Sequence, residues 1–255
     1  MSKPLEKENP AETPAPLWDA FLTERDREVF AAAGWGQRMG FGKRPAVLVI
    51  DVCYGLVGDK REPILDMIKR WSNSCGEEAW DALGPISATL DAARAKGLPV
   101  IYVTGRYRKD RWDRGALMFK NARVAEFGQP GGIDPMEIVP QIAPQPTDIL
   151  FYKQKPSAFF GTPLLSYLVL LGVDSLIVAG TSTSGCVRAS VVDAFNHNYR
   201  VAVVGDACFD RGQASHAMSL FDMNAKYADV IDSGEAVAHI ASLEDDLFVL
   251  PAGGL

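Results

Sequence analysis

The chain alternates between short, unbroken apolar runs and longer segments whose apolar residues recur with helical spacing. The apolar runs predict six strands, at residues 46–50, 98–103, 149–152, 176–179, 201–204 and 228–231. Helical patterns lie between them, at residues 86–95, 163–171, 187–196 and 214–227. Strands that are apolar throughout belong to sheets covered on both faces, and regular strand–helix alternation implies parallel pairing. We therefore predict an α/β fold with a doubly wound, mainly parallel six-stranded sheet in a Rossmann-like three-layer arrangement.

The residues before the first strand form a region of their own. Residues 1–16 are rich in Pro, Glu and Lys and poor in large apolar groups, so they predict a mobile tail. Residues 17–34 have the pattern of a short amphipathic helix that packs on the body of the protein or on a neighbouring subunit. We divide the chain into an N-terminal tail and packing helix, residues 1–37, and a single domain, residues 38–255.

Composition and charge exclude several classes of protein. The chain is 47% hydrophobic and 23% charged, which is ordinary for a globular protein. Its net charge of −6 and the absence of a concentrated basic stripe argue against nucleic-acid binding. No apolar run approaches the roughly 20 residues needed to span a bilayer, and the N-terminus lacks a signal-peptide core. We expect a cytoplasmic protein without nucleic-acid or membrane partners.

The cysteines and histidines do not predict a metal site. The four cysteines, Cys53, Cys75, Cys186 and Cys208, match no metal-binding spacing, and a reducing compartment argues against a disulfide framework. The three histidines are widely scattered along the chain. We therefore expect no metal ion and no cofactor.

Cys186 occupies the most suggestive position in the chain. The apolar run of residues 175–179 stops at Gly180, a cluster of small hydroxyl residues follows, and then Cys186 begins a helical pattern. This predicts a thiol in the first turn of a helix that rises from the carboxyl end of a buried strand. The free N–H groups and positive dipole there stabilise an anion, so we expect a lowered thiol pKa and a nucleophile. The alternative is a small buried cysteine in a tight turn.

Two further reactive side chains follow strand ends. Asp51 comes directly after the first predicted strand, where a half-enclosed carboxylate can act as a general base or merely cap the next turn. Lys153 ends the third, where it either enters an apolar pocket with a carboxylate partner or extends to solvent. Ligands of parallel α/β sheets bind beyond the carboxyl ends of the strands. The shared edge therefore groups Asp51, Lys153 and Cys186 as one candidate site.

These residues lie in segments that resemble the cysteine hydrolases of the isochorismatase-like superfamily. The resemblance spans about residues 38–235, and its segments are residues 45–51, 153–162, 180–187 and 193–195. The superfamily includes nicotinamidases and the amidohydrolases of N-carbamoylsarcosine, maleamate and biuret. The resemblance implies a doubly wound hydrolase fold and a catalytic triad of Cys186, Asp51 and Lys153. The family's lysine stands four residues before the serine of a Ser-Ala-Phe segment, which selects Lys153 over Lys155.

The resemblance also implies the surroundings of the cysteine. A cis peptide in the family's loop matches Thr181–Ser182, and the oxyanion hole would consist of the backbone N–H groups of Ser182 and Cys186. Members that act on isochorismate lack the cysteine, and nicotinamidases carry an Asp/His metal cluster after the first strand. Here that region reads Cys53-Tyr54-Gly55, and no histidine precedes His197. We therefore expect neither activity.

Within the superfamily the chain most resembles the N-carbamoylsarcosine amidohydrolase branch, through residues 40–46 and 207–211. That branch implies a carboxylate-binding arginine at Arg211, with Thr181 also assigned to substrate binding. A guanidinium suits bidentate carboxylate recognition, although Arg211 can instead be a surface partner of Asp210. We expect a small linear amide or ureido substrate with a carboxylate, ammonia as a product, and a homotetramer. The alternatives are a hydrolase of maleamate, a biuret-type urea or another small amide, and a catalytically silent binding homologue.

Overall fold

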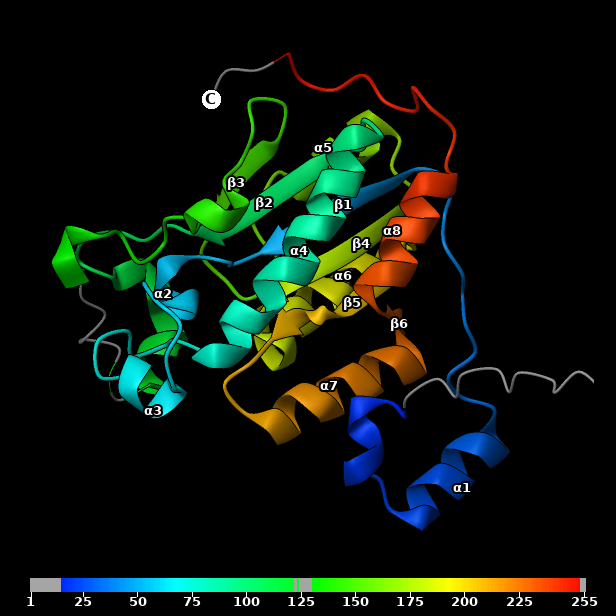
Figure 1. Ribbon diagram of the computed structural model, residues 1–255, viewed down its shortest axis with the longest axis horizontal. Coiled ribbons are helices and arrows are strands. Elements are labelled where there is room, and N and C mark those ends of the chain that lie inside the picture. Colours follow the sequence, from blue (N-terminus) through cyan, green and yellow to red (C-terminus); the bar gives the residue numbers. More distant parts are fainter. Residues whose placement is uncertain (1–14, 122, 124–129, 253–255) are drawn as a thin grey trace, which may run out of the picture.

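A central parallel sheet organises the computed structural model, which describes residues 15–252 except 122 and 124–129 (Figure 1). Within these residues, six strands pair in the order β3-β2-β1-β4-β5-β6, and every pairing is parallel. The strands are β1 (Pro45–Ile50), β2 (Val100–Gly105), β3 (Ile149–Lys153), β4 (Ser175–Thr181), β5 (Arg200–Phe209) and β6 (Asp229–Ile231). The predicted sheet is confirmed. The predicted tail, residues 1–16, lies almost wholly outside the described residues.

Helices cover both faces of the sheet. They are α4 (Glu77–Ala95), α5 (Leu164–Leu171), α6 (Arg188–Asn196), α7 (Gln213–Lys226) and α8 (Ser233–Ser242). Successive strand residues face opposite sides, so Val47 and Val49 of β1 join one core with α4 and α8. Leu48 and Ile50 join the other core with α5, α6 and α7. Figure 1 shows α4 and α8 in front of the sheet and α5 behind it, which confirms the three layers.

Two helical segments, η1 (Leu17–Phe21) and α1 (Glu24–Ala33), precede the first strand. The others lie in the connections between strands: α2 (Tyr54–Val57), α3 (Ile64–Met67), η2 (Trp112–Phe119), η4 (Pro130–Gly132), η5 (Pro140–Ile142) and η6 (Thr183–Val187). The sequence pattern did not predict α2, α3 or α8. It also placed the start of α4 at residue 86, whereas the helix begins nine residues earlier, at Glu77. Pro85 lies inside α4, and the buried Ala79, Ala82 and Leu83 attach the earlier turns to the core.

The predicted N-terminal packing helix is divided in two. The first part, η1, ends at Phe21, and Thr23 caps the second, α1, because its hydroxyl accepts from the Asp26 N–H while the Asp26 carboxylate accepts from the Thr23 N–H. Trp18 and Phe30 pack on Phe221 of α7, with ring centres 6.4 and 4.8 Å from that of Phe221. Of the two expected packing partners, this region therefore contacts the body of its own chain.

The fifth strand extends beyond its predicted end. The apolar run stops at Val204, because Gly205 and the exposed Asp206 follow it. The strand β5 nevertheless continues to Phe209. After a shift of register, Gly180 of β4 pairs with Cys208 and Thr181 with Phe209. Because of this extension, the residues that follow β5 begin beside the end of β4.

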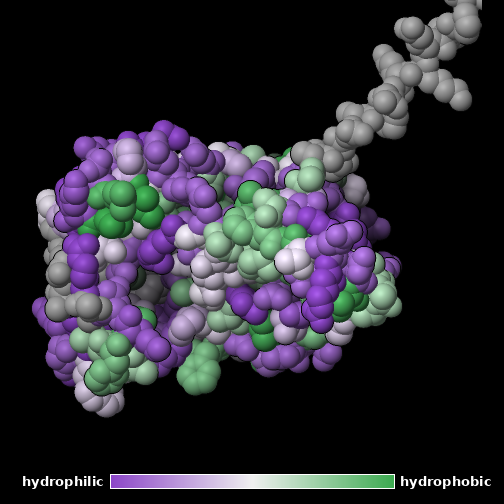
Figure 2. All heavy atoms as spheres, turned by 90° about the horizontal axis from the view of Figure 1, so that it is seen from below, coloured by the Kyte–Doolittle hydropathy of each residue, from purple (hydrophilic) through white to green (hydrophobic). Residues whose placement is uncertain are grey.

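The surface of the molecule is mixed in character. Figure 2 shows a face dominated by hydrophilic residues, with hydrophobic residues gathered in separate patches. Among the described residues, no helix is long and apolar enough to cross a membrane.

Gly180 allows the closest approach between β1 and β4. It pairs with Ile50 in the ladder and has a φ of 114°, a conformation that side chains rarely adopt. A Cβ at this position would lie 2.1 Å from the Ile50 carbonyl oxygen. The backbone at the end of β1 can therefore lie directly against β4 only because residue 180 has no side chain.

We expect Gly180→Ala to lower the free energy of unfolding by about 2–3 kcal/mol, because strain and a backbone clash combine. Gly97→Ala is the matched control, since Gly97 has a φ of 69° but no atom within 4 Å of a Cβ. That variant should lose only about 1 kcal/mol. Urea unfolding measures both, and equal losses would contradict the role of the clash.

Candidate active site

Cys186 lies in a single π-turn, η6, between β4 and α6. The Ser182 carbonyl accepts from the N–H groups of Gly185, at 2.8 Å, and Val187, at 3.1 Å, which closes the turn. Helix α6 begins only at Arg188. Cys186 therefore lies in the first turn of a helical segment, as predicted, but that turn is a π-turn and the regular α-helix follows it. Such π-turns are frequent at functional sites.

Asp51 carries the chain out of β1. Its φ of 55° lies in the left-handed region, which Asp tolerates better than most residues. The Asp51 N–H donates to the Val103 carbonyl of β2, at 2.9 Å, so the ladder is retained up to the turn. The residue is only 5% exposed. A buried carboxylate therefore stands where β1 ends.

Lys153 reaches Asp51 from two strands away. It pairs with Gly105 at the end of β2, which lies between β1 and β3, and is 3% exposed. Its Nζ lies 2.7 Å from Asp51 Oδ2 and donates to Cys186 Sγ at 3.3 Å. The structure thus brings together the three residues grouped from the sequence, here called the Cys–Lys–Asp cluster. Lys155 instead donates to the Asp113 carbonyl, at 3.2 Å.

The charges of the cluster differ from the sequence prediction. Burial raises the pKa of the Cys186 thiol to about 12, and Asp51 adds to the rise while Lys153 opposes it. The predicted lowering is therefore wrong, because lost hydration and a neighbouring carboxylate disfavour the thiolate. Burial acts to lower the pKa of Lys153, but the charges of Asp51 and Cys186 outweigh it and raise that pKa above its usual value. The resting site is a Lys153–Asp51 ion pair beside a neutral thiol.

The π-turn is held from the side of β3 by a hydrogen-bond chain. The Ser190 hydroxyl donates to the Cys186 carbonyl at 2.7 Å and accepts from the Ala158 N–H at 2.9 Å. Ala158 belongs to the Ser-Ala-Phe segment that follows Lys153 in the sequence. These hydrogen bonds therefore tie the Cys186 backbone to the loop that follows β3.

The other side of the turn is held by residues at the end of β5 and the start of α7. The fully buried Thr183 hydroxyl lies 2.7 Å from His216 Nδ1. Asp210 Oδ2 accepts from both the N–H and the hydroxyl of Ser184, at 2.7 and 2.6 Å. Sequence reasoning considered Asp210 only as a partner of Arg211 and gave His216 no role, because both contacts depend on the unpredicted extension of β5.

The peptide bond between Thr181 and Ser182 is cis, as expected. The Thr181 side chain is fully buried and donates to the Phe209 carbonyl at 2.9 Å, so its observed contact is with the neighbouring strand. Arg211 is exposed, and its Nη1 donates to Ser182 Oγ at 3.2 Å. Its Nη2 donates to the Asn73 carbonyl. The guanidinium therefore lies beside Ser182, next to the turn that carries Cys186.

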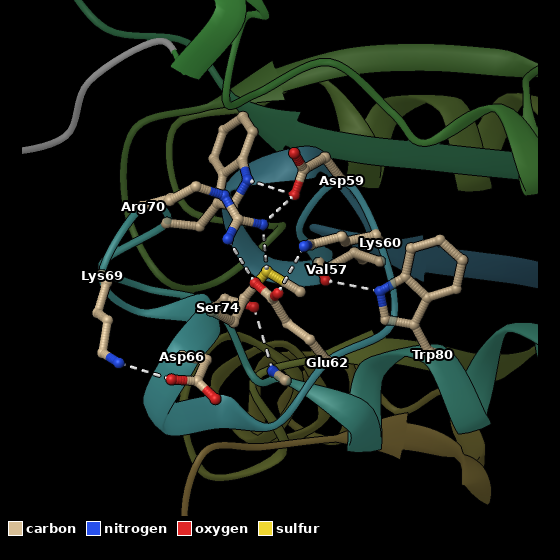
Figure 3. A network of polar contacts seen from close by, with 12 residues as sticks. Val57, Asp59, Lys60, Glu62, Asp66, Lys69, Arg70, Ser74 and Trp80 are labelled. Carbon is tan, nitrogen blue, oxygen red and sulfur yellow. Dashed lines mark hydrogen bonds and ion pairs between the residues drawn. The ribbon is translucent and has the colours of Figure 1, made fainter.

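Asn73 comes from the connection between α2 and α4, which an ionic network stabilises (Figure 3). Arg70 bridges Asp59 and Glu62, each at 2.6 Å, and the Trp71 indole donates to Asp59 at 3.1 Å. This connection reaches Arg211 through the Asn73 carbonyl.

Tyr107 is a residue of the site that sequence reasoning missed. Burial raises the pKa of its phenol, and the charges of all three members of the Cys–Lys–Asp cluster act on it. The Arg114 guanidinium lies 4.5 Å from the centre of its ring. Its position two residues after the end of β2, at the ligand-binding edge of the sheet, was the available signal.

We expect Lys153→Met to reduce turnover by about 10³-fold and stability by about 3–5 kcal/mol, because the Asp51 carboxylate would be buried without its partner. Lys155→Met is the matched control and should retain both. Steady-state kinetics and urea unfolding measure the two effects. Near-normal turnover in Lys153→Met would show that the reaction does not need this lysine.

The raised pKa of Cys186 predicts how alkylation depends on pH. Since only the thiolate reacts, the rate with iodoacetamide should rise about tenfold per pH unit from pH 7 to 10, without a plateau. Cys186 should still react before the buried Cys53, Cys75 and Cys208, because it is the only partly exposed cysteine. Mass spectrometry of labelled peptides measures each rate. A plateau below pH 8 would contradict the neutral resting thiol.

Comparison with known proteins shows which family this chain belongs to. The family model "Isochorismatase domain" matches residues 45–235. The chain is 34% identical over 210 residues to maleamate amidohydrolase of Pseudomonas putida, covering 82% of this chain and 92% of that protein. It is 29% identical to N-carbamoylsarcosine amidase of Arthrobacter, covering 90% and 83%.

The fold agrees with these similarities. The crystal structure of an isochorismatase family protein from Desulfovibrio vulgaris matches with a TM-score of 0.66 and 29% identity, covering 78% of this chain and 100% of that one. Asp51, Lys153 and Cys186 all lie within the residues that the family model matches. The chain belongs to the isochorismatase family, whose similar members here are amidohydrolases.

Proposed function

We propose that the protein is a cysteine amidohydrolase that cleaves a C–N bond of a small amide or ureido substrate bearing a carboxylate. The observation that carries the proposal is the Cys–Lys–Asp cluster: a thiol 3.3 Å from a buried ammonium, which in turn lies 2.7 Å from a buried carboxylate. This arrangement supplies a nucleophile, a proton acceptor and a fixed positive charge.

The first half of the reaction forms a thioester. The Asp51 carboxylate accepts the thiol proton while Lys153 stabilises the developing thiolate, whose raised pKa makes it a strong nucleophile once formed. Sulfur attacks the carbonyl carbon and a tetrahedral intermediate forms. Asp51 then returns the proton to the leaving nitrogen, the C–N bond breaks, and ammonia departs.

The second half restores the enzyme. Asp51 accepts a proton from a water molecule, the resulting hydroxide attacks the thioester carbonyl, and the C–S bond breaks. The sulfur regains a proton from Asp51, and the acid product leaves. No net proton or electron is required from another group.

The oxyanion of both tetrahedral intermediates would bind to the backbone N–H groups of Ser182 and Cys186. Ser182 stands directly before η6 and Cys186 within it, so both belong to the turn that presents the thiol. Preorganised donors of this kind are worth about 3–4 kcal/mol each in the transition state. The bonds from Ser190 and Asp210 keep this turn in place.

Arg211 supports the carboxylate in the proposed substrate. Its guanidinium lies at the edge of the site, where Nη1 donates to the Ser182 hydroxyl and Nη2 to the Asn73 carbonyl. Each of these nitrogens has a second N–H, and the planar arrangement of the guanidinium donors suits a carboxylate. Maleamate and N-carbamoylsarcosine, named by the similar proteins, both carry one. Because Arg211 lies so near the proposed oxyanion hole, the substrate should be short. Thr181 as a substrate contact and the homotetramer stay predictions.

A panel of maleamate, N-carbamoylsarcosine, biuret and nicotinamide, assayed for ammonia release, tests the proposal. We expect the two carboxylates to be hydrolysed in preference to biuret and nicotinamide, because only they can pair with Arg211. Cys186→Ala should lose at least about 10⁴-fold in turnover while remaining folded. Cys208→Ala is the matched control and should stay active. Full activity of Cys186→Ala, or preference for biuret, would contradict the proposed nucleophile or substrate class respectively.

A further inference from the structure

A single carboxylate links the nucleophile's turn to the proposed substrate anchor. Asp210 is 8% exposed and stands between β5 and α7. Its Oδ2 accepts from the N–H and the hydroxyl of Ser184, at 2.7 and 2.6 Å. Its Oδ1 accepts from the Arg211 N–H, at 2.7 Å. One buried group thus accepts three hydrogen bonds from two different parts of the site.

Each of these parts carries one end of the proposed reaction. Ser184 lies in η6, two residues before Cys186. Arg211 is the next residue after Asp210 and extends its guanidinium to Ser182, on the far side of the same turn. The position of the thiol relative to the guanidinium therefore depends on how firmly Asp210 holds both backbones.

We propose that Asp210 is a positioning residue that sets the spacing between the Cys186 nucleophile and the Arg211 anchor. This inference rests on the proposed function, because it takes Cys186 as the nucleophile and Arg211 as the carboxylate-binding group. Asp210 acts through these two residues and does not touch the reacting atoms itself.

The chemistry of the group explains why a carboxylate occupies this position. An ionised carboxylate only accepts hydrogen bonds, with two oxygens, and charge-assisted bonds of this kind are stronger than neutral ones. An asparagine has one accepting oxygen and one donating NH₂, so it cannot serve the Ser184 and Arg211 N–H groups from separate oxygens. A misplacement of about 1 Å between reacting groups can cost about 100-fold in rate.

The strand that precedes Asp210 provides a matched control. Asp206 of β5 likewise accepts from the N–H and the hydroxyl of a single serine, Ser233, at 2.9 and 2.6 Å, although it uses both of its oxygens to do so. Ser233 begins α8, remote from the π-turn. Asp206→Asn therefore removes a similar contact without touching either part of the site.

Alkylation of Cys186 by iodoacetamide at a fixed pH, with and without maleate, tests the proposal without relying on turnover. The alkylation rate depends on how the Cys186 thiol lies relative to Lys153. The maleate concentration that halves this rate measures how tightly the carboxylate binds at Arg211. In Asp210→Asn we expect about tenfold slower alkylation and about a tenfold higher half-protecting concentration, each the size of one lost hydrogen bond. Asp206→Asn should match the wild type in both.

Two further variants separate the halves. Ser184→Ala removes the hydroxyl bond at an exposed position that does not threaten folding, so it should slow alkylation and leave maleate protection unchanged. Arg211→Ala should raise the half-protecting concentration alone. If Asp210→Asn does not fold, unchanged alkylation in Ser184→Ala still overturns the proposal.

The outcomes distinguish this inference from the function on which it rests. If maleate does not protect the wild type, the carboxylate anchor fails and the positioning role fails with it. If maleate protects the wild type and folded Asp210→Asn behaves like it, only the positioning role of Asp210 is overturned. Equal effects of Asp210→Asn and Asp206→Asn would likewise reduce Asp210 to a structural contact.

Discussion

The buried ion pair between Lys153 and Asp51 is the interaction on which the site depends. Neither charge is tolerable alone in its position, because a buried charge without a partner costs several kcal/mol. Each residue is at most 5% exposed, and the two come from strands separated by β2. The pair therefore requires the sheet order to be formed before it can exist. In return it holds the carboxyl ends of β1 and β3 together at the place where Cys186 lies.

The ion pair also decides the state of the thiol. A single buried cation, shared with a carboxylate at 2.7 Å, is not enough to stabilise a thiolate at 3.3 Å against the loss of water. The thiol therefore rests neutral, and in the proposed reaction its proton passes to Asp51 when a substrate carbonyl is in place. Such a site demands a well-fixed turn, which is why hydrogen bonds reach η6 from Ser190 on one side and from His216 and Asp210 on the other.

Much of the fold could be predicted because continuous apolar runs have few alternatives in a parallel sheet. The predictions were wrong where local pattern and packing disagree. Gly205 and Asp206 interrupt the apolar pattern without interrupting β5, because the ladder resumes after a shift of register. Pro85 sits inside α4 because the residues before it are buried against the core. The π-turn at Cys186 was not predicted, because the pattern of apolar residues does not distinguish a π-turn from an α-helical turn.

By itself the sequence determined the strands, their common direction and the three side chains at their ends, since all of these follow from local pattern and position. Only the tertiary structure decided which of these side chains meet and with what charge. Lys153 contacts Asp51 across a third strand, and the pKa of Cys186 rises because folding removes water from it. The contacts of Asp210 and Arg211 exist only because β5 extends to the end of β4. Burial and distance are properties of the assembled sheet, and no local pattern encodes them.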